Sequence, residues 1–234
     1  MKKLGFTLAE VMIALSLIGV IASLTIPTFV SETKNKANAN KLATTVSAIE
    51  NAFTSMIANE GVQDLSETAF AGSPTAGNLS NYLKISGSSG NYVNLYNNNN
   101  KPFKDLSGSS NTLSWTDSFK MKNGAYIIYS SNSVDIDSAN VTSWGGTITN
   151  SIGRIIIDVN GSLKPNIWGR DAFYFRIGND GLLYPAGSLN FSILEKNSNS
   201  HLWNGSSGNF LCNEKEKTQG CTARLIENNY EVDY

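Results

Sequence analysis

The chain has 234 residues, with 18 Lys and Arg against 19 Asp and Glu, and a formal net charge of −1. This length leaves room for one globular domain beside an N-terminal appendage, and the near-neutral charge excludes a whole-chain field that favours nucleic acid or an anionic membrane, although a local basic patch is compatible with it. A hydrophobic content of 41% excludes a disordered chain, and a composition rich in Asn, Ser and Gly with only 16% charged residues suits a secreted β-rich domain.

The N-terminus carries a long apolar segment. Residues 6–30 are almost continuously apolar, and Glu10 is the only charged residue between Phe6 and Glu32. About 20 helical residues cross a hydrocarbon core of ~30 Å, so the segment is long enough to span a membrane. Lys2 and Lys3 precede it and hold the short N-terminus in the cytoplasm by the positive-inside rule. The sequence therefore predicts a membrane-spanning helix with the rest of the chain outside the cytoplasm.

Three ordinary explanations of this segment compete. A secretory signal has an apolar region of about 7–15 residues, which is shorter than the run seen here. A simple membrane anchor fits the length but gives no reason for Glu10, since a carboxylate inside a membrane segment costs roughly 2.5–3.5 kcal/mol. A buried core helix fits poorly because the segment begins at the chain terminus behind two lysines.

The run Leu4 to Glu10, LGFTLAE, explains the acid. It resembles the cleavage and methylation motif of the type IV pilin and type II secretion pseudopilin superfamily. The resemblance implies that residues 1–5 are a prepilin leader, that a membrane-bound aspartyl peptidase cuts after Gly5, and that it N-methylates Phe6. It also implies that Glu10 neutralises the N-terminal amine of a neighbouring subunit during assembly, so Glu10 sets the register of packing and is not a catalyst.

Two further residues of the apolar segment, Gly19 and Pro27, also match the family. Glycine weakens a helix interior by about 1 kcal/mol, and proline removes a backbone donor. The resemblance implies that the helix loosens between these positions when it packs in a filament. The alternative is that Pro27 only kinks the helix where it leaves the membrane.

Beyond the membrane segment the helical pattern continues as an amphipathic stretch over residues 31–60. We expect a single helix from Phe6 to about Ala58, stopped by Glu60 and Gly61. The alternative is two helices broken around Pro27. The apolar stripe that indicates the second half is Leu42, Val46, Ile49, Phe53 and Ile57, at helical spacing.

The remaining residues, 61–234, are expected to form a β-rich globular domain. Residues 61–122 are polar, with loop signals and short strand candidates such as Tyr92 to Tyr96, and we expect a variable connection there. Closely spaced strands favour an antiparallel sheet, covered by the apolar stripe of the helix. This α+β arrangement is also the fold that the resemblance implies. The predicted strands are residues 125–129, 154–159, 172–177, 182–184 and 222–226.

Cys212 and Cys221 are the only cysteines. A close pair in an exported chain is most simply a disulfide that closes a short loop, as pilins often have near the last strand. Zinc would need more ligands, and His201 is the only histidine.

A second local motif begins at Asp158, in the run DVNGSLKPN. Asp158 and Asn160 before a glycine resemble the start of an EF-hand loop, although the acid expected at its twelfth position is missing. Major pseudopilins bind calcium in a sheet-edge loop, so the resemblance extends to a calcium site made by Asp158, Asn160, Asn166 and Asp171. The simpler interpretation is an Asx turn, in which Asp158 and Asn160 cap their own backbone. Farther along, Asn179-Asp180-Gly181 predicts a tight turn.

No nucleophile elbow and no phosphate-binding loop is present in the sequence, so we expect neither an enzyme nor a cofactor beyond calcium. The resemblance implies a structural subunit of a type IV pilus or type II secretion pseudopilus. Its partners would be other pilin subunits, the prepilin peptidase, the inner-membrane assembly platform with its cytoplasmic ATPase, and the membrane itself, with no nucleic acid required. The precursor would lie in the bacterial inner membrane and the product in a periplasmic or extracellular filament. The alternative function is a minor, tip-located subunit that binds a surface, DNA or a secreted substrate.

Overall fold

The computed structural model describes Gly5 and residues 7–72, 75–88, 103–104, 110–111, 117–129, 151–161, 163–186, 212 and 220–233. The leader residues 1–4, Phe6, the candidate strand Tyr92 to Tyr96, and His201 lie outside this part. The chain divides into two compact units, residues 1–37 and residues 38–234, and each is considered by itself.

One helix, α1, runs from Leu8 to Glu60 and contains both Gly19 and Pro27. The expectation of a single helix is therefore confirmed, and a break around Pro27 is not found. Two hydroxyl groups before the proline donate hydrogen bonds to backbone carbonyls of the preceding turn. Ser23 Oγ donates to the carbonyl of Val20 (2.8 Å), and Thr25 Oγ1 donates to that of Ile21 (3.0 Å). The proline removes one donor from the helix without ending it.

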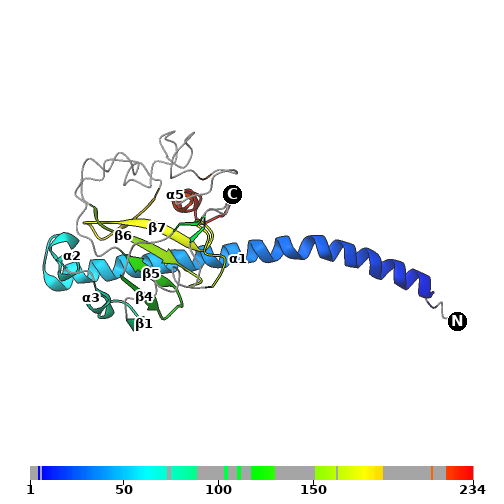
Figure 1. Cartoon of the computed structure of the whole chain (residues 1–234), viewed down its shortest axis with the longest axis horizontal. Coiled ribbons are helices and arrows are strands. Elements are labelled where there is room, and N and C mark those ends of the chain that lie inside the picture. The colour runs from blue at the N-terminus through cyan, green and yellow to red at the C-terminus, as the bar shows by residue number, and fades with distance from the viewer. Residues whose placement is uncertain are drawn as a thin grey trace. The chain divides into compact units, whose positions relative to one another are not determined.

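The folded domain is built on a six-stranded sheet in the order β1-β4-β5-β6-β7-β8, in which every neighbouring pair is antiparallel. The second half of α1 runs along this sheet (Figure 1), so the α+β prediction is confirmed. A separate two-stranded sheet is formed by β2 and β3. The strands are β1 (Ile85–Ser88), β2 (Phe103–Lys104), β3 (Ser110–Asn111), β4 (Asp117–Met121), β5 (Tyr126–Tyr129), β6 (Ser151–Asp158), β7 (Ala172–Gly178) and β8 (Leu183–Pro185).

Both faces of the central strands are buried, which the sequence analysis did not foresee. Along β6, Ile155 and Ile157 pack in the core that contains α1, and Ile156 between them belongs to a second cluster. Alternation along a strand sends successive side chains to opposite faces. The second cluster contains Phe103, Ile128, Ile156, Trp168, Ala172, Tyr174 and Ala186. The predicted helix stripe is confirmed, with Ile57 partly buried at its end.

Two predictions about the β-rich region are wrong. Residues 222–226 are not a strand, because α5 (Cys221–Glu227) is a helix; the β-branched Thr222 and Ile226 suggested a strand, whereas Ala223, Arg224 and Leu225 are good helix formers. Residues 61–122 are more than a connection, because they supply β1 and β4 to the sheet. They also contain the short helices η1 (Leu65–Glu67), α2 (Ala69–Gly72) and α3 (Ala76–Ser80).

The predicted turn at Asn179-Asp180-Gly181 joins β7 to β8. Gly181 has a φ of 81°, and a Cβ at this position would lie 3.1 Å from Phe53 Cβ on α1. The left-handed backbone and the close approach to the helix both require glycine here.

Candidate functional site

The first turn of α1 is closed by reciprocal hydrogen bonds between Thr7 and Glu10. Thr7 stands at the N-cap, directly before Leu8. Its hydroxyl accepts the backbone N–H of Glu10 at 3.3 Å, and Glu10 Oε2 accepts both the backbone N–H and the hydroxyl of Thr7, each at 2.8 Å. This arrangement is a capping box. The carboxylate that the sequence analysis singled out therefore already has a partner within its own chain.

The two glycines of the N-terminal segment have open surroundings among the described residues. A Cβ added at Gly5 or at Gly19 would meet no described atom within 4 Å, and neither residue is among those with positive φ. The described part of the chain therefore gives no packing or backbone reason for glycine at these positions.

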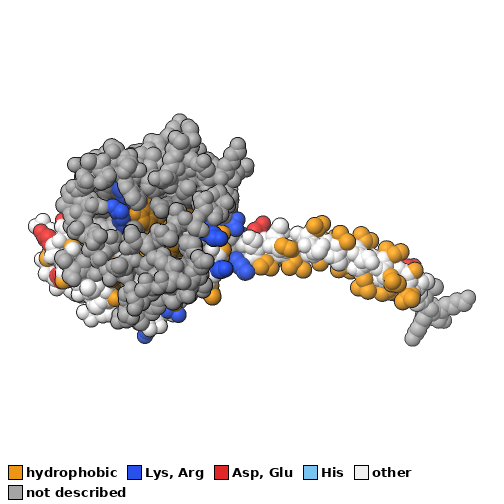
Figure 2. Space-filling view, viewed as in Figure 1, with side chains coloured by type: hydrophobic (Ala, Val, Ile, Leu, Met, Phe, Trp, Pro, Cys, Tyr) orange, Lys and Arg blue, Asp and Glu red, His pale blue; other side chains and the backbone are white. Residues whose placement is uncertain are grey.

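The N-terminal half of α1 exposes a continuous apolar surface. α1 is long and apolar enough to cross a membrane, and none of its most apolar part is buried. Figure 2 shows the hydrophobic side chains along this half of the helix. Each large side chain gains about 1.5–3 kcal/mol on full burial, so the surface needs lipid or other helices to cover it. The exposed residues are Leu8, Val11, Met12, Ile13, Leu15, Leu17, Ile18, Val20, Ile21, Leu24, Ile26, Phe29 and Val30.

Polar contacts fix the second half of α1 on the sheet. Near its start in the folded domain, Asn38 Nδ2 donates to the carbonyl of Arg170 at 3.0 Å. Farther along, Glu50 Oε1 accepts the backbone N–H of Leu183 at 3.0 Å. Burial raises the pKa of Glu50, and the nearby Asp180 adds to the shift, while the bond from Leu183 opposes it. Glu50 is thus a structural acid in the helix–sheet interface.

The four residues of the predicted calcium site lie in the connection from β6 to β7 and are brought together. Asp171 is fully buried, and its carboxylate accepts the side-chain amide of Asn160 (2.9 Å) and the backbone N–H groups of Asn166 (2.8 Å) and Ile167 (2.5 Å). Asp158 Oδ1 accepts the backbone N–H of Asn160 at 3.2 Å, which is the Asx turn of the simpler interpretation. Burial raises the pKa of Asp171, and these N–H donors oppose the shift.

These contacts do not fit a calcium site. Both oxygens of Asp171 and one of Asp158 accept N–H groups, whereas calcium needs about six to eight oxygen ligands free to point at the ion. Among the described residues, no group of three or more His, Cys, Asp or Glu side chains could hold a metal. Asn160 Oδ1 is buried without a hydrogen-bond partner in this part of the chain. Calcium binding by these residues is untested, and a calcium titration of the melting temperature would decide between the metal site and the Asx turn.

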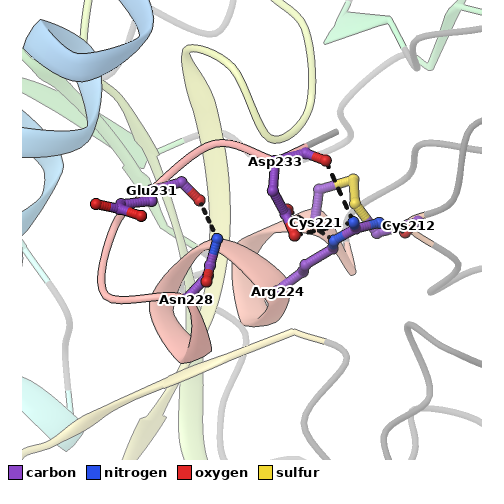
Figure 3. Close-up of polar contacts among 6 residues, drawn as sticks. All are labelled: Cys212, Cys221, Arg224, Asn228, Glu231 and Asp233. Atoms are coloured by element: carbon purple, nitrogen blue, oxygen red, sulfur yellow. Dashed lines mark hydrogen bonds and ion pairs between the residues drawn. A yellow bond between two sulfur atoms is a disulfide. The ribbon is translucent and has the colours of Figure 1, made fainter.

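The C-terminal disulfide is present and is held by an arginine. Cys212 and Cys221 are bonded, with their Cα atoms 4.8 Å apart. Arg224 Nη1 donates to the carbonyl of Cys212 at 2.6 Å, and its Nε and Nη2 donate to the two carboxylate oxygens of Asp233 at 2.9 and 3.0 Å (Figure 3). One guanidinium therefore joins the disulfide loop, α5 and the C-terminal segment. On the other side of α5, Thr222 Oγ1 accepts the N–H of Tyr174 in β7.

Two of these features were missed from the sequence. Thr7 could have been found, because Thr-x-x-Glu before an apolar run is the sequence signature of a capping box. The contacts of Arg224 could not, because Asp233 is nine residues away and no spacing rule joins them. The roles predicted for Gly5, Phe6, Glu10, Gly19 and Pro27 concern other molecules and stay predictions.

Comparison with known proteins identifies the N-terminal segment. Residues 1–26 match the family model of the prokaryotic N-terminal methylation motif. The match includes Gly5, Thr7, Glu10 and Gly19 and ends directly before Pro27. No curated protein and no solved structure matches the chain.

Proposed function

We propose, from the prepilin-type signal of type IV pilins and pseudopilins that this chain carries at residues 1–26, that the protein is a structural subunit of a type IV pilus or a type II secretion pseudopilus. The observation that supports this most directly is Glu10, a lone carboxylate at the start of an exposed apolar helix. The subunit carries out no reaction. It is a substrate of the prepilin peptidase and then a building block.

The first step is cleavage of the Gly5–Phe6 peptide bond and methylation of the new amine of Phe6. Open space around Gly5 supports this assignment, since none of the described residues outside its immediate neighbours lies within 4 Å of a Cβ added there. Glycine lets a protease approach the peptide bond closely. The leader of residues 1–5 stays behind, and the mature subunit begins with a cationic amine beside the apolar segment.

The second step is assembly through α1. The amine of one subunit meets Glu10 of a neighbour, and at ~4 Å and an effective dielectric of ~20 this pair attracts by about 4 kcal/mol before desolvation is subtracted. Removal of either partner would strand the other charge in the apolar interior of the filament, which is costly. The exposed apolar side chains of α1 are covered at the same time by those of other subunits. Loosening of α1 between Gly19 and Pro27 would adapt it to this packing.

The precursor lies in the inner membrane with residues 38–234 outside the cytoplasm. This location is supported by the apolar helix and by Lys2 and Lys3 before it. An assembly platform in the same membrane and a cytoplasmic ATPase would then extract the processed subunit into the filament.

Mass spectrometry of the mature N-terminus tests the proposal. We expect a chain that starts with N-methylated Phe6, and a Gly5→Ser variant that keeps its leader. A mature chain with any other first residue would contradict the assignment. A tip-located minor subunit would carry the same signal, and abundance separates the two: a major subunit dominates sheared filaments, whereas a tip subunit is nearly absent from them.

A further inference from the structure

Two arginines lie side by side on the face of the sheet opposite α1. Arg154 in β6 is directly opposite Arg176 in β7. Their neighbours along the strands decide the face. Ile155 and Phe175 pack in the core that contains α1, so the alternation of side chains along a strand sends both arginines to the other face. We call Arg154 and Arg176 the arginine pair.

One guanidinium of the arginine pair is enclosed and the other is accessible. Arg176 is 9% exposed, whereas Arg154 is half-buried. Burial lowers the pKa of Arg176, and Tyr174 opposes this shift while Arg154 adds to it. Arginine nevertheless stays protonated in proteins. Two positive charges are therefore held next to each other on this face of the sheet.

Tyr184 in β8 borders the arginine pair on its other side. It is directly opposite Arg176 and is 8% exposed. Its hydroxyl donates to Asp180 Oδ2 at 2.5 Å, and Asp180 Oδ1 accepts the backbone N–H of Leu182 at 3.0 Å. Both oxygens of this acid thus hold the β7–β8 turn, and the ring of Tyr184 lies between β8 and the pair.

The arrangement of the arginine pair favours an anion between the two side chains. Like charges directly opposite each other destabilise neighbouring strands. Asp158, the acid on the same face of β6, is four residues from Arg154, about 13 Å along the strand, which is too far for an ion pair. Each guanidinium has five N–H donors, so an arginine that already has a partner can also bind a ligand. An anion would be attracted by both groups and would relieve their repulsion.

We propose that the arginine pair binds a phosphate group. A guanidinium presents a planar fork of donors that matches two oxygens of a phosphate, and a phosphate has enough oxygens for two such forks. The burial of Arg176 strengthens a hydrogen bond made there, because the local dielectric is low. A ligand on this face would not compete with the packing of α1 on the sheet. The inference goes beyond the proposed function, since the folded domain would be a binding module as well as a building block.

Titration of the full chain with inorganic phosphate, in an uncharged maltoside detergent, tests the site. Calorimetry measures the affinity, and sodium chloride keeps the ionic strength constant throughout. Phosphate salts also stabilise proteins in general, because they are excluded from the surface. The wild type and the variants are therefore compared in the same buffers, and binding is judged by its saturation.

Two variants of Arg154 and one control separate the guanidinium fork from charge alone. Arg154→Gln removes the accessible guanidinium, and Arg154→Lys keeps the charge without the fork. The control, Lys122→Gln, removes an exposed positive charge from the β4–β5 turn, outside the pair. Melting temperatures without phosphate show that each variant is folded.

We expect the wild type and Lys122→Gln to bind phosphate with the same affinity. Arg154→Gln should bind about tenfold more weakly, because it loses a hydrogen bond between charged groups, and Arg154→Lys should lie between the two. Glycerol 3-phosphate, titrated in the same way, identifies the source of the group. Tighter binding than that of inorganic phosphate would support a phosphorylated organic ligand, and equal or weaker binding would support the free ion.

Three results would overturn the inference. The first is a wild type that shows no saturable phosphate binding, as expected if a carboxylate of the chain itself occupied the space between the two guanidinium groups. The second is equal affinity in Arg154→Gln and the wild type. If Arg154→Gln does not fold, Arg154→Lys decides, and the third result is an affinity of Arg154→Lys equal to that of the wild type.

Discussion

Thr7 and Glu10 close the first turn of α1 as a capping box, in which each residue accepts the backbone N–H of the other. The carboxylate of Glu10 is therefore engaged by its own chain before the proposed cleavage would create a new amine at Phe6. In the proposed assembly, the carboxylate would either leave Thr7 for the amine of a neighbouring copy or accept hydrogen bonds from both.

Replacement of Thr7 removes the N-cap of α1 and leaves the charge of Glu10 in place. Thr7→Val removes the hydroxyl that bonds the N–H of Glu10, and an N-cap lost in this way costs about 1 kcal/mol of helix stability. We expect faster hydrogen exchange in the first turn of α1 in detergent micelles, whereas Thr7→Ser keeps the slow rate. Equal exchange rates in the two variants would argue against the capping box.

Replacement of Glu10 makes the converse test. Glu10→Gln keeps an oxygen that can accept the N–H of Thr7 but removes the charge, and Glu10→Val removes both. We expect the leader to be cut from both variants and filaments to be strongly reduced in both, as measured by shearing and by the mass of the mature chain. Normal filaments from Glu10→Gln would show that the cap, and not the charge, is what assembly requires.

Glu50 gives the folded domain a defined pH dependence. Its raised pKa means that the folded state binds a proton more tightly than the unfolded state. Stability from this group is fully present below the ordinary glutamate pKa and is lost as the pH rises through the higher folded value. We expect Glu50→Gln, which keeps an acceptor for Leu183, to flatten this part of the curve of melting temperature against pH. At neutral pH the variant gains up to about 1 kcal/mol, since Glu50 is only half-buried. If the melting temperature of Glu50→Gln depended on pH in the same way as that of the wild type, Glu50 would not be the cause of this pH dependence.

Asp171 holds the β6–β7 connection through its buried carboxylate. Asp171→Ala leaves the buried N–H groups of Asn166 and Ile167 without their acceptor, and we expect a loss of about 3 kcal/mol in the free energy of unfolding by urea. Because the wild-type carboxylate is occupied by these donors, millimolar calcium should leave the melting temperature unchanged. A rise in the melting temperature with calcium would establish the metal site instead.

The disulfide between Cys212 and Cys221 should contribute a measurable part of the stability. The two cysteines are separated by nine positions, and closing a loop of this size contributes about 2–3 kcal/mol. We expect the double variant Cys212→Ser, Cys221→Ser to lose that amount in urea unfolding, and a reducing agent to lower the wild type to the same level. A reducing agent that also destabilises the double variant would point to a different cause.

Much of the fold could be predicted because its signals are local. Strands β5 to β8 are short β-branched or aromatic runs between turn residues, and the stripe from Leu42 to Phe53 has the helical period. The second half of α1 and these strands follow from such patterns. β4 could not be predicted in the same way, because DSFKM contains only two apolar residues and its pairing with β1 and β5 decides its conformation.

A site residue could be predicted from the sequence where its type is unusual for its surroundings. It could not be predicted where its role depends on a contact with a residue distant in the sequence. Glu10 stands out because an acid in an apolar run needs a partner. The contact between Arg224 and Asp233 does not stand out, since nine positions separate them and only the fold brings their side chains together. The helix α5 was misjudged because Thr222 was interpreted by its strand propensity, although its hydroxyl serves β7 from a helix.

The bond between Thr222 and Tyr174 joins α5 to the middle of the sheet. Tyr174 lies in β7, and its N–H is accepted by a hydroxyl that follows Cys221 of the disulfide directly in the chain, so the strand is linked to the closed C-terminal loop. The helix after the disulfide thus adds to the hydrogen bonding of β7 from outside the sheet, beside the pairing of this strand with β6 and β8.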